Sequence, residues 1–138
     1  MRTIKRNSRV SNIYRFKSLK ANKILKCESL AEVTQGLRNE LDTNVVSQCT
    51  QPFTIKYLFN GKQCHYTPDF LVKMLDGEWR VIEVKPANHI KPFKEKFEVV
   101  KHILERKGIT FLINSDESLF SYQALFDLNS RYIQRFYV

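Results

Sequence analysis

Two acidic residues and one lysine lie in two neighbouring apolar runs of this sequence. Asp69 opens the first run, and Glu83 and Lys85 lie on either side of Val84 in the second. A carboxylate in an apolar environment is costly unless a cation compensates its charge. Mg²⁺ prefers oxygen ligands, and it activates water and neutralises the charge that develops on a phosphate. The pattern therefore predicts phosphodiester hydrolysis, with Asp69, Glu83 and the Val84 carbonyl as metal ligands and Lys85 as a catalytic cation.

The turn between the two runs decides whether the acids meet. A two-residue loop would place Asp69 and Glu83 on opposite faces of a hairpin. A three-residue loop over residues 75–77, with Gly77 in the left-handed bulge position, places the two acids opposite each other. We predict the three-residue loop. Lys85 then shares the face of Glu83, because side chains along a strand alternate with period two. The alternative is that Glu83 and Lys85 face solvent on a half-exposed strand.

A helix is predicted upstream, from Ser29 to Asp42, because apolar residues recur there at helical spacing. Glu32 lies in its first turn and has two interpretations. Ser29 and Glu32 match a capping box, in which the glutamate side chain accepts a hydrogen bond from a backbone amide at the start of the helix. Glu32 is also a candidate for a third acid near the metal site.

The elements that complete the domain follow from hydrophobic periodicity and turn signals. Residues 45–51 are expected to be a connection between elements. The further predicted elements are a hairpin over residues 53–67 with its turn at Asn60-Gly61, a helix over 92–107, a strand over 109–113 and short helices over 119–138. In the last segment, the expected packing residues are Phe120, Leu125, Leu128, Tyr132 and Ile133. A helix between two strands predicts that those strands are parallel, within a mixed sheet.

The net charge of +9 is concentrated at the N-terminal end. The first 26 residues contain nine Lys and Arg and no acidic residue, so basic and acidic residues are equal in number in the rest of the chain. We expect an extended or irregular basic arm over residues 1–26 that binds a DNA backbone. A solvated tail would explain the charge equally well. The candidate DNA-binding residues are Arg6, Arg9, Arg15, Lys17, Lys20 and Lys23.

The composition is that of a folded globular protein, with 43% hydrophobic and 12% aromatic residues in 138 residues. No apolar run reaches the length of a membrane span, and the basic first residues are not followed by the apolar segment of a secretory signal. We therefore expect a cytoplasmic protein. Cys27, Cys49 and Cys64 have unrelated spacings, which favours reduced structural thiols over a metal site or disulfides.

Four motifs, in this order, resemble the TnsA endonuclease family. The motifs are Glu28-Ser29-Leu30-Ala31-Glu32, Gln51-Pro52-Phe53, Tyr66-Thr67-Pro68-Asp69-Phe70-Leu71-Val72 and Val81-Ile82-Glu83-Val84-Lys85-Pro86. The resemblance extends from about Ser8 to Ile113. It implies an α/β fold with a restriction-endonuclease-like core of the PD-(D/E)xK class, a mixed central sheet flanked by helices, over residues 27–138. It also implies Mg²⁺ as cofactor, with Mn²⁺ as a substitute.

The resemblance assigns roles to single residues. Glu32 resembles the helix-borne acid that completes the metal site, with Glu28 as the alternative for that role. Asp69 resembles the central metal ligand, Glu83 the second ligand and Lys85 the catalytic lysine. For Glu32, the family position outweighs the capping interpretation.

The resemblance also implies partners. TnsA-like nucleases cut the DNA strand at transposon ends that a TnsB-like DDE transposase does not cut, so DNA and such a transposase are the expected partners. Larger members continue into a region that contacts a TnsC-like ATPase regulator, and this sequence ends at Val138, which leaves that contact open. Alternative functions are a Holliday-junction or repair nuclease of the same fold, or a non-catalytic DNA-binding module.

Overall fold

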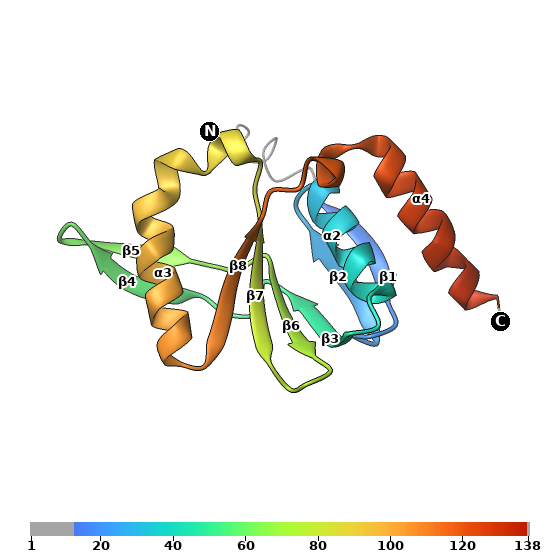
Figure 1. Cartoon of the computed structure of the whole chain (residues 1–138), viewed down its shortest axis with the longest axis horizontal. Coiled ribbons are helices and arrows are strands. Elements are labelled where there is room, and N and C mark those ends of the chain that lie inside the picture. The colour runs from blue at the N-terminus through green and yellow to red at the C-terminus, as the bar shows by residue number, and fades with distance from the viewer. Residues whose placement is uncertain (1–12, 138) are drawn as a thin grey trace, which may run out of the picture.

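The computed structural model describes residues 13–137 (Figure 1). The helices and strands are β1 (Tyr14–Ser18), β2 (Lys23–Cys27), α2 (Leu30–Leu41), β3 (Val45–Thr50), β4 (Ile55–Phe59), β5 (Lys62–Tyr66), β6 (Phe70–Met74), β7 (Trp79–Val84), α3 (Lys94–Arg106), β8 (Ile109–Asn114) and α4 (Tyr122–Ile133). Short 3₁₀ turns are η1 (Ala87–His89), η2 (Lys91–Phe93), η3 (Glu117–Phe120) and η4 (Gln134–Phe136).

The central sheet has four strands in the order β3-β6-β7-β8. The β3–β6 and β6–β7 pairs are antiparallel, and β7–β8 is parallel, with α3 as the connection between its two strands. The predicted α/β class, with a mixed central sheet flanked by helices, is therefore confirmed. In the part of the chain that the structure describes, no helix is long and apolar enough to cross a membrane.

The β6–β7 hairpin has the predicted three-residue loop. Phe70 pairs with Ile82, and the Met74 amide donates to the Glu78 carbonyl at 2.8 Å. Gly77 has a φ of 92°, which side chains with a Cβ rarely adopt. One step beyond the Phe70–Ile82 pair, this register sets Asp69 opposite Glu83.

Two apolar cores lie on the two faces of the sheet. Figure 1 shows α3 on one side, and α2, α4 and the β1–β2 hairpin on the other. On the α2 side, Phe70, Val72 and Val84 pack with Ala31 and Leu119. On the α3 side the core consists of Val81, Phe97, Val100, Leu104 and Phe111. The odd-numbered positions of β7 therefore face α3, and this is the face on which Glu83 lies.

The strands β4 and β5 form a separate two-stranded sheet, which we call the ribbon. Its turn is the predicted one, because Asn60 and Gly61 both have positive φ, 52° and 77°. One face of the ribbon packs on the α3 core through Ile55, Tyr57 and Tyr66. Its far end projects beyond α3 (Figure 1).

The prediction of an extended or irregular arm over residues 1–26, outside the nuclease domain, is wrong from Tyr14 onward, because β1 and β2 form an antiparallel hairpin that packs on the core. Phe16 and Leu25 face inward, and Leu25 and Cys27 are buried. Phe16 lies so close to α2 that a Cβ at Gly36 would be 2.7 Å from its ring. The hairpin is therefore part of the folded domain. Its dense charge conceals the period-two alternation of its apolar residues.

The prediction of a connection over residues 45–51 is also wrong, because β3 forms the edge of the central sheet beside β6. Gln48 occupies an inward position with 4% exposure. Its side-chain amide donates to the Gly36 carbonyl at 3.0 Å and to Glu40 at 2.6 Å. An inward glutamine breaks the apolar alternation by which a strand is recognised in sequence.

Glu40 is the most extensively hydrogen-bonded buried acid on the α2 side, with 1% exposure. Its Oε2 accepts from Ser18 at 2.5 Å and from Gln48 at 2.6 Å. Its Oε1 accepts from the Tyr132 hydroxyl at 3.0 Å and from the backbone amides of Leu19 and Lys20 at 3.1 and 3.2 Å. One carboxylate thus connects the β1–β2 hairpin, α2, β3 and α4.

The predicted helices are confirmed, and so is the strand over residues 109–113. Tyr132 in α4 is buried as expected, and Leu125 and Leu128 are half-buried. Phe120 and Ile133 depart from the prediction, because they are 42% and 41% exposed. Phe120 is the last residue of η3, before α4 begins, and Ile133 is the last residue of α4.

Candidate active site

Asp69 lies where the ribbon ends and β6 begins. Pro68 is fully buried and has no amide to donate, so the chain enters β6 without a ladder hydrogen bond at that position. The Asp69 carboxylate crosses to β7, where its Oδ2 accepts a hydrogen bond from the Val84 amide at 2.7 Å. The Gln51 amide donates to the Asp69 carbonyl at 3.2 Å. Both contacts fix this acid at the same end of the sheet as Glu83.

Glu83 is the second acid of the site and is 9% exposed. It lies on the α3 face of β7, where the register sets it opposite Asp69. Its Oε1 accepts a hydrogen bond from the Tyr66 hydroxyl at 2.6 Å. The alternative of a solvent-facing Glu83 is therefore excluded.

The charge of buried Glu83 acts on half-buried Asp69. Burial, followed by the charges of Glu83 and Glu32, raises the pKa of Asp69 to about 8, against smaller opposing effects of the Val84 amide and Lys85. Burial also raises the pKa of Glu83, against the opposing effects of the Tyr66 hydrogen bond and Lys85. Two carboxylates that repel each other in a desolvated position favour a bound cation.

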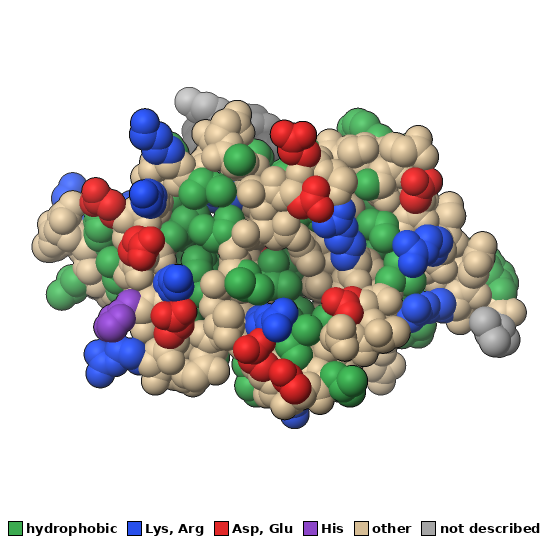
Figure 2. All heavy atoms as spheres, in the orientation of Figure 1, with side chains coloured by type: hydrophobic (Ala, Val, Ile, Leu, Met, Phe, Trp, Pro, Cys, Tyr) green, Lys and Arg blue, Asp and Glu red, His purple; other side chains and the backbone are tan. Residues whose placement is uncertain are grey.

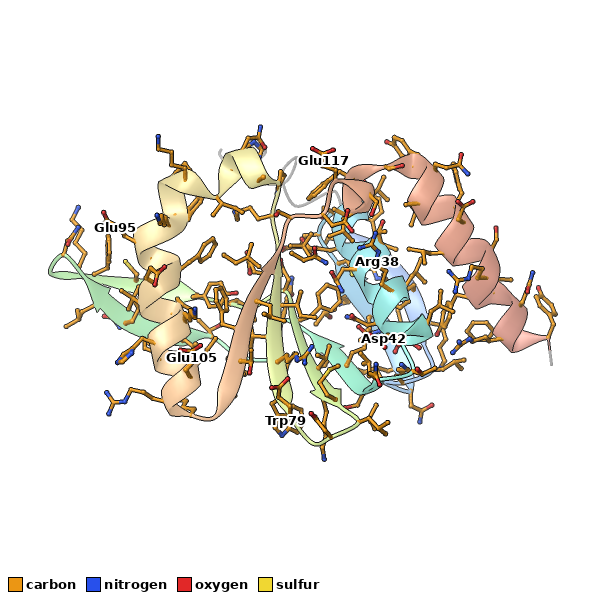
Figure 3. All side chains as sticks on the ribbon, viewed as in Figure 1. Arg38, Asp42, Trp79, Glu95, Glu105 and Glu117 are labelled. Atoms are coloured by element: carbon orange, nitrogen blue, oxygen red, sulfur yellow. The ribbon has the colours of Figure 1, made fainter. Side chains whose placement is uncertain are left out.

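Lys85 projects on the same face as Glu83 and lies near an aromatic pair. Its Nζ is 4.3 Å from the centroid of the Phe93 ring and 6.0 Å from that of Phe97. The Lys85 amide donates to the Asn114 carbonyl of β8 at 3.2 Å. In Figure 3, Trp79 marks one end of β7 and Glu117 lies near the other end, which is where the site is located. The aromatic rings hold the ammonium beside the acids through cation–π attraction.

Glu32 is in the capping box, at the N-terminus of α2. Ser29 accepts from the Glu32 amide at 3.1 Å, and Glu32 Oε1 accepts from the Glu28 amide at 3.1 Å. The Glu32 charge still contributes to raising the pKa of Asp69 and Glu83. Of the three predicted acids, the structure therefore pairs Asp69 with Glu83 and keeps Glu32 nearby in a capping hydrogen bond.

The donor set fits a divalent cation in part. Among residues 13–137, no group of three or more His, Cys, Asp or Glu side chains is arranged to hold a metal ion. Mg²⁺ commonly binds through one or two carboxylates, with water and substrate phosphate as its other ligands. Asp69 and Glu83 satisfy this requirement. Burial raises the pKa of both carboxyl groups, and a positive charge bound between them would offset that effect. The predicted carbonyl ligand, Val84, lies between Glu83 and Lys85 on β7.

A cleft of about 430 Å³ opens beside Glu83 and Lys85, between the ribbon and α3. Tyr66, His65 and Lys96 also line it. The cleft gives solvent and a phosphate access to the lysine and to one of the acids. Along α3 itself, acidic and basic side chains are interspersed (Figure 2), which is typical of a solvated helix face.

The predicted DNA-binding residues have different surroundings. Arg6 and Arg9 lie outside the described residues. Arg15, Lys17 and Lys23 are exposed on the β1–β2 hairpin. Lys20 differs, because its Nζ donates to the carbonyls of Asn39 and Asp42 at 2.7 and 2.5 Å, which caps the C-terminal end of α2.

Sequence reasoning missed Tyr66, Phe93 and Phe97 as parts of the site. Tyr66 is visible in the sequence as the last inward residue of the strand before Pro68-Asp69, at the right period for the core face. No local signal points to Phe93 or Phe97, because their contact with Lys85 depends on how α3 packs over the sheet.

A mixed sheet flanked by helices, with two paired acids and a lysine at one end of a central hairpin, has the arrangement of a restriction-endonuclease-like nuclease core. The family model for the TnsA-like endonuclease N-terminal domain matches residues 42–116, more than half of the chain, and the chain belongs to this family. It is thus a nuclease domain of the kind that acts in transposition. The match includes Asp69, Glu83 and Lys85. No curated protein gives a significant match to the chain.

Proposed function

We propose that the protein is a Mg²⁺-dependent DNA endonuclease, the TnsA-like subunit of a heteromeric transposase, which cleaves DNA strands at transposon ends. The observation that supports this most directly is the pairing of half-buried Asp69 with buried Glu83, beside Lys85, within the residues that match the family. A TnsB-like DDE transposase is the proposed partner. A TnsC-like ATPase regulator is proposed as a further partner of the assembly.

In this proposal Asp69 and Glu83 hold the cation through their carboxylate oxygens. When bound there, a divalent cation would supply a lowered pKa for a water molecule and neutralisation of charge on the scissile phosphate. Lys85 donates hydrogen bonds from Nζ to a non-bridging phosphate oxygen, and its charge stabilises the pentacovalent transition state. The water oxygen forms a bond to phosphorus as the bond from phosphorus to the leaving sugar oxygen breaks; the water releases one proton to solvent, and the leaving oxygen takes up one proton from solvent. The Phe93 ring keeps the Lys85 ammonium in place.

The β1–β2 hairpin is the proposed contact with the DNA backbone. Its outward face pairs Arg15 with Lys26 across the strands, and Lys17 is the next outward residue on β1. Like charges directly opposite each other are destabilising, so a bound polyanion would relieve a repulsion that the fold maintains.

The test is cleavage of transposon-end DNA by the protein together with its TnsB-like transposase, with and without Mg²⁺. We expect cleavage only with Mg²⁺, and a loss of about 10²-fold or more for Lys85→Met, which keeps the alkyl stem over Phe93 but removes the charge. Lys101→Met, on the exposed face of α3, is the matched control and should cleave normally. Mg²⁺-independent cleavage, or full activity of Lys85→Met, would contradict the proposal. Preferential cutting of branched DNA would support a junction-resolving nuclease instead.

The two roles of Glu32 can be separated by Glu32→Gln. Glutamine accepts the same backbone hydrogen bond, so the free energy of unfolding should change by less than about 0.5 kcal/mol. Cleavage should fall by about tenfold or more, because the variant removes a negative charge from beside the acid pair. Urea unfolding and the cleavage assay measure the two effects. Unchanged cleavage would restrict Glu32 to capping, and Glu32→Ala, which loses the cap, provides the comparison.

A further inference from the structure

A tyrosine from the ribbon reaches the acid pair. The Tyr66 hydroxyl donates to Oε1 of Glu83 at 2.6 Å, the shortest hydrogen bond that Glu83 makes to a side chain within the described chain. The tyrosine hydroxyl is an uncharged donor with a single O–H group. A neutral donor can stabilise the carboxylate without occupying the place of a cation.

The ring that carries this hydroxyl is held from two sides. Tyr66 meets Phe97 of α3 edge to face, with ring centroids 6.3 Å apart, and Phe111 of β8 at 6.0 Å. Such edge-to-face pairs add to the stabilisation that comes from the area they bury. Phe97 is also beside Lys85. One aromatic cluster therefore supports the tyrosine that contacts Glu83 and the lysine that follows it.

The chain connectivity adds to this arrangement. Tyr66 is the last residue of β5, and Asp69 follows after Thr67 and Pro68. The same short segment thus provides one acid of the pair and the hydrogen-bond donor to the other acid. A carboxylate has two oxygens, so a fixed hydrogen bond to Oε1 also fixes the direction in which Oε2 points. Partners that orient metal ligands in this way typically contribute 10- to 100-fold to metal affinity.

We infer that Tyr66 is a positioning residue, which holds the Glu83 carboxylate in the orientation that binds the divalent cation. This inference rests on the proposed function of the same site. Tyr66 acts through Glu83 and takes no direct part in bond breaking. Its effect should therefore appear in the affinity for the cation and only weakly in the rate of cleavage once the cation is saturating.

The experiment compares wild-type protein, Tyr66→Phe and Tyr57→Phe. Phenylalanine keeps the ring in the aromatic cluster and removes only the hydroxyl. Tyr57 lines the same cleft from β4 and provides the matched control. Mn²⁺ binding, measured by electron paramagnetic resonance of the free ion in the absence of DNA, is the first readout. The Mg²⁺ dependence of cleavage is the second, and thermal unfolding in EDTA by circular dichroism is the third.

We expect Tyr66→Phe to weaken Mn²⁺ binding by 10- to 100-fold and to raise the Mg²⁺ concentration for half-maximal cleavage by a similar factor. Its cleavage rate at saturating Mg²⁺ should stay within about threefold of wild type, and Tyr57→Phe should match wild type. Equal Mn²⁺ affinity of Tyr66→Phe and wild type would overturn the inference but leave the proposed function intact. Loss of cooperative unfolding in Tyr66→Phe would overturn it as well, because Tyr66 would then be a residue of the core. An absence of Mn²⁺ binding by wild type would overturn the proposed function itself.

Discussion

Asp69→Asn is expected to abolish DNA cleavage and, in the absence of divalent cations, to make the protein more stable at pH 8. Asparagine can still accept the hydrogen bond from the Val84 amide, so the local structure is retained. It cannot provide the negative charge that holds a cation. Loss of several kcal/mol of transition-state stabilisation corresponds to a decrease in cleavage of about 10²–10³-fold.

The gain in stability follows from the raised pKa of Asp69, about 8 in the folded protein against about 3.9 in an unfolded chain. Between these two values the folded protein binds a proton that the unfolded chain has released. The free energy of unfolding of the metal-free wild type should therefore fall as the pH rises from about 4 to about 8. Asp69→Asn removes the part of this dependence that comes from Asp69. The free energy of unfolding of Asp69→Asn should exceed that of wild type by about 1–3 kcal/mol at pH 8 and equal it near pH 4.

Thermal unfolding in EDTA across this pH range, repeated with excess Mg²⁺, measures both effects. Mg²⁺ should raise the melting temperature of wild type, since a ligand that binds only the folded state stabilises it, and should have little effect on Asp69→Asn. Asp127→Asn, on the exposed side of α4, controls for the loss of one carboxylate at the surface. If Asp69→Asn were less stable than wild type at pH 8, the charge of Asp69 would not destabilise the metal-free protein, contrary to this prediction.

Glu40→Ala is expected to destabilise the domain by about 3–5 kcal/mol, the largest effect on stability in this set. The substitution removes an acceptor shared by five donors. The Tyr132 hydroxyl keeps the Lys17 carbonyl at 2.8 Å and the Leu19 amide keeps the Tyr132 hydroxyl at 2.9 Å, so the donors left without this acceptor are those of Ser18, Gln48 and the Lys20 amide. Each unsatisfied buried donor costs about 1–3 kcal/mol before the structure relaxes. The β1–β2 hairpin and α4 should loosen together, because both are bound to this carboxylate.

Urea unfolding measures the loss, and amide hydrogen exchange locates it. Glu40→Gln keeps an acceptor oxygen, so its free energy of unfolding should fall by less than that of Glu40→Ala. The free energy of unfolding of Tyr132→Phe should fall by about 1 kcal/mol. Glu98→Ala on the exposed side of α3 is the control for replacing a helical glutamate. A loss below 1 kcal/mol for Glu40→Ala, or exchange that rises only in α4, would contradict the role of Glu40 as the common acceptor.

The acid pair could be predicted because local chemistry determines it. Gly77 and the three-residue loop set the register of β6 and β7, and period-two alternation then places Asp69, Glu83 and Lys85 on one face. The turn at Asn60-Gly61 and the helix start at Ser29 were equally readable, because each depends on a few adjacent residues.

The missed elements depend on contacts between distant segments. Strand β3 has Gln48 facing inward, where a strand pattern requires an apolar residue, and its hydrogen bonds to Gly36, Asn39 and Glu40 of α2 make that position acceptable. The alternation in β1 was present as Tyr14 and Phe16, but the basic residues around them favoured an irregular arm. For Glu32, sequence allowed both roles, and in this structure its carboxylate accepts the capping hydrogen bond.

The separation of the ribbon from the central sheet has a practical consequence for changes in chain length. Its turn lies far from the β6–β7 register, and a Cβ built at Gly61 meets no atom within 4 Å. Residues inserted at this turn would lengthen the ribbon without breaking a hydrogen bond of the four-stranded sheet. A fluorescent label could therefore be attached at this turn, because the spacing of Asp69 and Glu83 would be unchanged.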